Sequence, residues 1–187
     1  MRAFIGIRLP DEIRASLQRL QGELAVSQAD VKWVEPANLH VTVKFLDEIS
    51  DAQRQAVENF LTRIARQEDP FALGLDGVGA FPSVQAPRVI WVGLVQGVEA
   101  VARIAESLER EAAELSLRQE PRPFSAHLTL GRVRSPKRLQ PLAQRLRTVS
   151  PPAPAPWRVE SLTLYQSVLD SSGPRYTVLA DVPLKKG

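Results

Sequence analysis

The feature that most constrains the fold is a repeated spacing of helix and strand patterns in the two halves of the chain. In the first half, apolar residues at steps of three and four predict a helix that begins near Asp11, 29 residues before His40. In the second half, a similar helical pattern begins near Val98, 29 residues before His127. Another helix is expected to begin roughly ten residues after each histidine. This repeat predicts two similar lobes that arose by internal duplication.

The remaining elements follow from local signals. Ser50 and Gln53 form a capping-box pattern for the second helix, and Ser135 with Pro136 predicts the start of the fourth. A Gly/Pro-rich bend is expected at 77–82, and an extended linker at 151–156. Alternating or apolar runs predict strands at 2–8, 40–45, 71–78, 89–94, 126–130, 158–166 and 176–182.

Composition excludes several classes of protein. Apolar residues make up 44% and charged residues 24% of the chain, which is typical of a globular protein. The absence of cysteine excludes disulfides, thiolate metal sites and a cysteine nucleophile. No run approaches the roughly 18 apolar residues of a membrane span, and the first residues alternate like a strand rather than a signal peptide. We therefore expect a cytoplasmic monomer; the net charge of +3 is only weak support for a polyanionic partner.

Both histidines of the chain are followed by the pattern x-Thr-x within a predicted strand. Residues two apart share one face of a strand, so His40 projects with Thr42, and His127 projects with Thr129. If the two lobes meet, two imidazoles and two hydroxyls face one cleft. One histidine on a strand is usually structural, but two copies at matching places in a repeat favour a catalytic site.

This set of groups is suited to cleavage of a phosphodiester. A neutral imidazole can take a proton from water, while a protonated imidazole donates one to the departing ribose oxygen. Threonine hydroxyls can donate hydrogen bonds to the non-bridging phosphate oxygens, where the transition state carries charge. Zinc usually takes three or four ligands, whereas Asp47 and Glu48 lie close in sequence to one histidine only. We therefore expect chemistry without a metal.

Several segments resemble the two-histidine (2H) phosphoesterase superfamily, and specifically the RNA 2′,3′-cyclic phosphodiesterases, also called 2′-5′ RNA ligases. The resemblance covers nearly the whole chain, and its most specific parts are the two His-x-Thr-x motifs. One departure is Asp47, where that family commonly has glycine in a turn. The matching segments are residues 2–10, 33–46, 79–82, 87–91, 122–132, 166–169 and 173–176.

The resemblance implies an α+β fold in which residues 1–187 form one bilobal domain. Two antiparallel sheets, flanked by helices, would surround a central cleft, with one motif per lobe at 40–43 and 127–130. It implies hydrolysis of RNA 2′,3′-cyclic phosphate ends to 2′-phosphomonoesters with no cofactor. By analogy, His40 would protonate the leaving O3′ and His127 would activate water, although the residues themselves do not choose between the two roles. Some members also join tRNA halves through a 2′-5′ linkage by the reverse reaction.

Other candidate site residues have weaker support. Family analogy places Arg132 at the phosphate; strict alternation points it away from His127 unless Gly131 allows a bulge, and a surface arginine is the alternative. Lys44 falls on the His40 face and is expected at the rim or in solvent. Phe45 and Phe124 are candidates to stack on a base, although alternation favours core packing for Phe45.

Three further aromatic residues have different expected places. Trp33 is another candidate to stack on a base, whereas Phe81 and Trp91 are expected in the core.

Two other functions remain open. The protein could act on small cyclic or 2′-5′-linked nucleotides, or it could bind RNA ends without turnover. Product analysis separates the first from RNA-end hydrolysis, and histidine substitutions separate the second.

Overall fold

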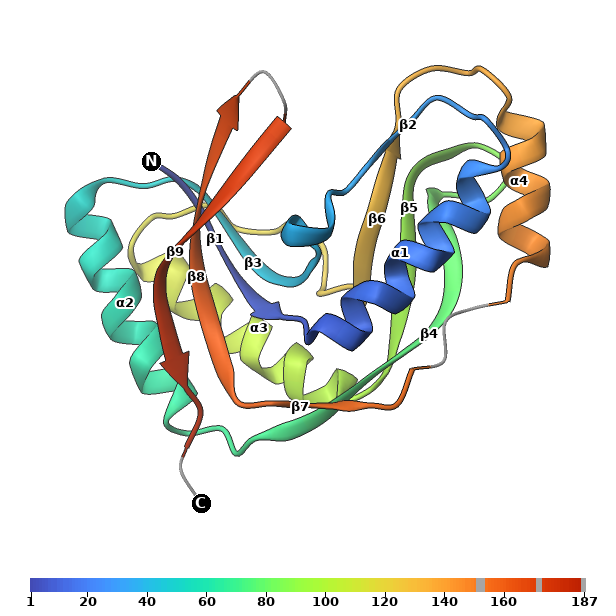
Figure 1. Ribbon diagram of the computed structural model, residues 1–187. Helices are drawn as coiled ribbons and strands as arrows, with labels where there is room; N and C mark the ends of the chain where they lie inside the picture. Colours follow the sequence, from blue (N-terminus) through green and yellow to red (C-terminus); the bar gives the residue numbers. More distant parts are fainter. Residues whose placement is uncertain (151–153, 171–172, 186–187) are drawn as a thin grey trace.

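The chain folds into two antiparallel sheets covered by helices, and the computed structural model describes residues 1–150, 154–170 and 173–185 (Figure 1). This confirms the expected α+β class. The described residues form four α-helices: α1 (Asp11–Ala25), α2 (Asp51–Ala65), α3 (Val98–Glu114) and α4 (Leu139–Thr148). The strands are β1 (Arg2–Arg8), β2 (Val31–Trp33), β3 (His40–Glu48), β4 (Phe71–Pro82), β5 (Pro87–Gln96), β6 (His127–Val133), β7 (Trp157–Val159), β8 (Ser161–Asp170) and β9 (Gly173–Pro183), and a short 3-10 helix, η1, covers Pro36–Asn38.

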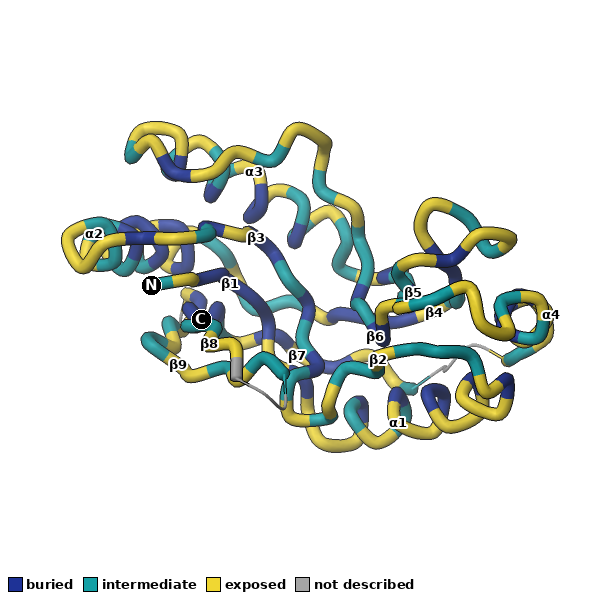
Figure 2. Tube along the Cα trace, turned by 90° about the horizontal axis from the view of Figure 1, so that it is seen from above, coloured by how far each residue is buried: buried dark blue, intermediate teal, exposed yellow. Residues whose placement is uncertain are grey.

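The two halves of the chain exchange elements. One sheet has the strand order β3-β1-β8-β9, and the other has the order β2-β6-β5-β4-β7. The sheet containing β3 is therefore completed by the β8–β9 hairpin from the second half, and the sheet containing β6 by the β4–β5 hairpin from the first. The helices cross in the same way, because α3 packs on β3 beside α2, while α1 packs beside α4. In both views α2 and α4 lie at opposite ends of the molecule (Figures 1 and 2).

The helices begin and bury their faces largely as their sequences predict. Ile13, Leu17, Leu20 and Leu24 are the buried apolar residues of α1. At the start of α2, the Ser50 side chain accepts from the Gln53 backbone N–H, and the Gln53 side chain accepts from that of Ser50, which confirms the capping box. In the view from above, the buried turns of α3 face β3 (Figure 2), and α2 contacts α3, β8 and β9.

Several predicted boundaries are wrong. Helix α4 begins at Leu139 rather than at Pro136, because Arg138 has a left-handed backbone conformation with a φ of 56°. The Ser135 hydroxyl oxygen accepts a hydrogen bond from the Lys137 backbone N–H and so forms a local turn before the helix. Strand β4 continues through 79–82 instead of bending, since Gly79 makes room for the Trp91 ring that lies over it.

The C-terminal strands also differ from the prediction. The expected strand at 158–166 is divided at Glu160 into β7 and β8, which belong to different sheets. Three-residue β2 was not predicted, because it is too short to show a period. Part of the expected linker at 151–156, residues 151–153, lies outside the described residues. The buried side chains of both sheets belong to one continuous hydrophobic core.

Because each sheet needs a hairpin from the other half, we expect neither half to fold alone. Residues 1–96 without 97–187 would leave the edge of β1 without its partner strand β8 and would leave β3 without α3 packed on it. Urea titration followed by circular dichroism should give a cooperative transition for the full chain and a shallow, non-cooperative change for each fragment. A sharp transition in either separate fragment would contradict this account of the fold.

Candidate active site

The two motif strands belong to different sheets and meet at one cleft. The cleft has a volume of about 780 Å³, and its lining includes Thr42, His127, Thr129 and Arg132. This size lies within the range of sites that bind small molecules. His40 does not line the cleft itself but lies directly behind Thr42, with its Nε2 2.8 Å from the threonine hydroxyl oxygen. The structure therefore brings the four motif side chains to one place.

Each histidine ring is fixed by a backbone carbonyl two residues before it. His40 Nδ1 lies 2.6 Å from the carbonyl oxygen of Asn38, and His127 Nδ1 lies 2.8 Å from that of Ser125. A carbonyl oxygen only accepts, so Nδ1 carries a proton and donates it in both rings. In the neutral ring Nε2 is then the unprotonated nitrogen, and both imidazoles present the same atom for proton transfer.

Aromatic rings surround His40 more closely than His127. The His40 ring lies 4.6 Å from the Phe4 ring and 5.2 Å from the edge-on Tyr176 ring, measured between centroids. His127 meets the edge of one ring, Phe81, at 5.1 Å. His40 is accordingly the more enclosed of the two imidazoles.

Burial lowers the pKa of both histidines from the ordinary value of 6.5, because it penalises the charged imidazolium. The hydrogen bonds to Asn38 and Ser125 act in the opposite direction. At His127, the nearby charge of Arg132 lowers the pKa further, although by less than burial does. Both imidazoles therefore lose their protons more readily than a histidine in water.

A β-bulge follows the threonine in each motif strand and decides which later side chain faces the cleft. In β3 the pairing with β1 skips Val43, and in β6 the pairing with β5 skips Leu130. The skipped residue reverses the alternation that follows. Phe45 and Arg132 therefore come to the cleft face at equivalent positions of the two strands. The redirection of Arg132 toward the His127 face is thus explained by a bulge next to Gly131.

The opposite wall of the cleft is formed by α3 and by the segment that connects it to β6. Half of the residues of this wall are apolar, and three of the others carry carboxylates. Its cleft-lining residues are Ala102, Ala105, Glu106, Glu109, Glu120, Pro121, Arg122, Pro123, Phe124 and Ser125.

Comparison with known proteins identifies the family. The family model described as LigT-like phosphoesterase matches this chain twice, over residues 7–91 and 92–176. The chain belongs to the LigT-like phosphoesterase family. The double match also supports the internal duplication predicted from the helix and strand spacing, and its boundary lies within β5, between the two interlocked halves.

Relatives of similar length include cyclic phosphodiesterases. The RNA 2′,3′-cyclic phosphodiesterase of Archaeoglobus fulgidus is 36% identical over 94% of this chain and 96% of its own. That of Methanothermobacter thermautotrophicus is 33% identical over 95% of each chain. Among solved structures, the protein TT0787 of Thermus thermophilus superposes with a TM-score of 0.85 at 32% identity, covering 99% of this chain and 98% of that one. Escherichia coli LigT complexed with 3′-AMP gives a TM-score of 0.82 at 30% identity with the same coverage.

In this LigT-like phosphoesterase, the expected place of Lys44 is wrong. The bulge at Val43 turns Lys44 into the interior, where it is 2% exposed. Its Nζ forms an ion pair with Glu109 at 2.8 Å and donates to the Arg118 carbonyl oxygen at 2.5 Å. Lys44 therefore ties the first motif strand to α3 and to the segment that leads to His127.

The aromatic residues also differ from expectation. Phe45 is 42% exposed and lines the cleft, so the interpretation that it packs in the core is wrong. Phe81 likewise lines the cleft beside His127 rather than lying in the core. Phe124 lines the facing wall, whereas Trp33 packs against the core beside Gly131. The cleft thus contains three phenylalanine rings near the motif side chains.

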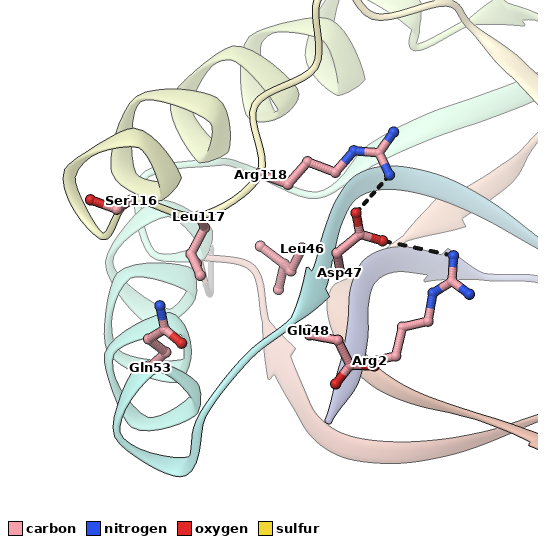
Figure 3. A pocket seen from close by; sticks show the side chains of 8 residues that line it. All are labelled: Arg2, Leu46, Asp47, Glu48, Gln53, Ser116, Leu117 and Arg118. Atoms are coloured by element: carbon pink, nitrogen blue, oxygen red, sulfur yellow. Dashed lines mark hydrogen bonds and ion pairs between the residues drawn. The ribbon is translucent and has the colours of Figure 1, made fainter.

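A charged network holds the far wall of the cleft in place. Figure 3 shows Asp47 between two arginines, with Arg118 at 2.8 Å and Arg2 at 3.7 Å. Asp47 has a φ of 55°, a left-handed backbone conformation that is consistent with the glycine common at this position in the family that the sequence resembles. From Arg118 the network continues to Glu120, whose backbone N–H donates to Glu109 at 2.7 Å. The segment 118–125 is therefore anchored to both β3 and α3.

Sequence reasoning missed the residues that enclose His40. Phe4 and Tyr176 come from β1 and β9, which are distant in sequence from the motif; the resemblance covers both segments but gives these two residues no role. Asn38 both supplies the carbonyl that fixes His40 and donates from its side chain to the Pro174 carbonyl oxygen at 2.7 Å. Its place two residues before the histidine, mirrored by Ser125 before His127, is a local signal that the sequence contains for Asn38.

Metal-ligating clusters and helices of membrane-spanning length are both absent from the described residues. Within residues 1–150, 154–170 and 173–185, no group of three or more His, Cys, Asp or Glu side chains is placed to hold a metal ion. In the same part of the chain, no helix is long and apolar enough to cross a membrane.

We expect Lys44→Met to lower the free energy of unfolding by about 1–3 kcal/mol, because Glu109 Oε2 and the Arg118 carbonyl oxygen both lose the buried Lys44 ammonium as their donor. The Arg63–Glu111 ion pair is likewise made to α3, in this case from α2, but the Arg63 side chain is 58% exposed. Arg63→Met is the matched control and should cost less than about 1 kcal/mol. Equal losses for the two variants in urea unfolding would contradict the importance of the buried pair.

Proposed function

We propose that this protein hydrolyses RNA 2′,3′-cyclic phosphate ends to 2′-phosphomonoesters, with His40 and His127 as general acid and general base. The observation that carries the proposal is the matched orientation of the two imidazoles, each with Nδ1 bonded to a carbonyl so that Nε2 is the nitrogen left for proton transfer. His127 lines the cleft itself, and His40 Nε2 faces the hydroxyl oxygen of Thr42, which lines it. The names of the relatives support the same reaction class.

His127 is suited to activate water, since it lines the cleft where water has access. Its neutral Nε2 takes a proton from water as the oxygen attacks phosphorus. The bond from phosphorus to O3′ breaks, and O3′ takes the hydroxyl proton of Thr42 while the Thr42 oxygen takes the Nε2 proton of protonated His40. The product carries a 3′-hydroxyl and a 2′-phosphate. Before the next turnover His127 must release its proton to solvent, and His40 must take up a proton.

Thr42 links the acid to the phosphate. When His40 is protonated, its Nε2–H donates to the Thr42 oxygen, so the hydroxyl proton of Thr42 is available for a phosphate oxygen. Thr129 and Arg132, on the cleft face of β6, supply further donors to the non-bridging oxygens. These roles place positive charge and hydrogen-bond donors where the transition state accumulates negative charge.

The first test uses an RNA oligonucleotide with a 2′,3′-cyclic phosphate end, in EDTA, with wild type, His40→Ala and His127→Ala. Wild type should give the 2′-phosphate, and each variant should be slower by on the order of 10²–10⁴-fold. An absence of turnover by wild type, with RNA binding weakened in both variants, would instead indicate a binding protein. Loss of activity in EDTA with rescue by zinc would contradict metal-free chemistry, and an added 5′-hydroxyl RNA tests for 2′-5′ joining.

The pH dependence follows from the lowered pKa values of the two histidines. Activity needs one neutral and one protonated imidazole, so kcat/KM should be bell-shaped with its maximum on the acid side of pH 6.5. The anionic phosphate in the complex favours imidazolium, which should move the alkaline limb of kcat to higher pH than that of kcat/KM. A flat profile from about pH 5 to 9 would exclude histidine acid–base catalysis.

A further inference from the structure

The carboxylates that line the cleft all lie on one of its walls. The wall formed by α3 and the following segment presents Glu106, Glu109 and Glu120 among apolar side chains, with Arg122 as its one cleft-lining cation in the described chain. The β6 wall presents Arg132 beside His127. Each of these carboxylates is ion-paired, Glu106 with Arg110, Glu109 with Lys44 and Glu120 with Arg118, so their charge is largely compensated. The cation beside His127 is Arg132, so an RNA strand whose last phosphate lies at the histidines is attracted to the β6 side of the cleft.

On the other side of Arg132 lies a second cation, Lys32. Strand β2 is the edge strand of its sheet, and Lys32 is paired directly opposite Arg132 in the antiparallel register. Trp33 lies opposite Gly131 and packs toward the core side, where an added Cβ on that glycine would meet its ring at 2.8 Å. Alternation therefore puts Lys32 on the same face as Arg132, with Cβ atoms roughly 5 Å apart.

Lys32 also stands between the two sheets. A Cβ built on Gly173, at the start of β9, would lie 3.7 Å from Lys32 Nζ. Gly173 belongs to the sheet that carries His40, whereas Lys32 belongs to the sheet that carries His127. Since the Lys32 side chain is exposed, its ammonium lies where a strand leaving the histidines would pass between the lobes.

We infer that Lys32 and Arg132 form a subsite for RNA in which Lys32 binds the phosphodiester on the 5′ side of the terminal nucleotide. This rests on the proposed function, which puts the cyclic phosphate at Arg132. Two adjacent cations then match two successive phosphates of one strand, and an ammonium is a compact partner for a phosphate oxygen. The substrate class that the site favours is an oligonucleotide with at least one internal phosphate, over a free cyclic mononucleotide.

The test compares two substrates with the same terminal nucleoside. One is the nucleoside 2′,3′-cyclic phosphate, and the other is a trinucleotide that ends in it. Lys32→Gln should lower the ratio of kcat/KM for the trinucleotide to that for the mononucleotide about tenfold, as expected for one charge-assisted contact. Arg19→Gln removes an exposed cation on α1 and should leave this ratio unchanged. Because it is a ratio, it does not depend on the fraction of folded enzyme.

Salt gives a second readout. In Lys32→Gln, the slope of log kcat/KM against log salt for the trinucleotide should become shallower by about 0.7, the value for one single-strand phosphate contact. If wild type turns over both substrates and Lys32→Gln changes neither ratio nor slope, the subsite is wrong and the hydrolytic function stands. If wild type turns over neither substrate, the proposed function itself fails.

Discussion

The active-site geometry depends on the burial of the apolar backs of the two motif strands. Val41 and Leu46 of β3, and Leu128 and Leu130 of β6, are almost fully buried. Helices and hairpins from opposite halves of the chain provide this cover, so neither motif strand can be held in place by its own half alone. The histidines and threonines project from the other face of rigid strands, where small displacements would disturb the proton transfer proposed for them.

Much of this arrangement could be predicted because periodicity is a local property. The helices near Asp11 and Val98, the strands that begin at His40 and His127, and the sharing of one face by His and Thr all follow from spacing. The bulges are different. Gly131 signalled one of them, but Val43 is β-branched and gives no sign that β3 skips a residue there. That single register shift exchanged the expected positions of Lys44 and Phe45.

Long-range contacts account for the other differences. Lys44 is stable in the interior only because Glu109 and the Arg118 carbonyl, which are far away in sequence, converge on its ammonium. Phe81 reaches the cleft because β4 continues past Gly79, whose missing side chain accommodates Trp91. Such positions depend on the partner that arrives from another element, and a local sequence pattern does not contain that partner.

The duplication keeps its geometry while its chemistry diverges. Both strands have the same order of histidine, threonine and bulge, yet the residue that the bulge delivers to the cleft is Phe45 in one and Arg132 in the other. The proposed substrate has a flat base with stackable faces at one end and an anionic phosphate at the other, and a phenylalanine and an arginine on opposite sides of one cleft would suit these two ends. A pseudo-symmetric frame can thus recognise an asymmetric ligand, because the two equivalent positions after the bulges are the ones that differ in chemistry.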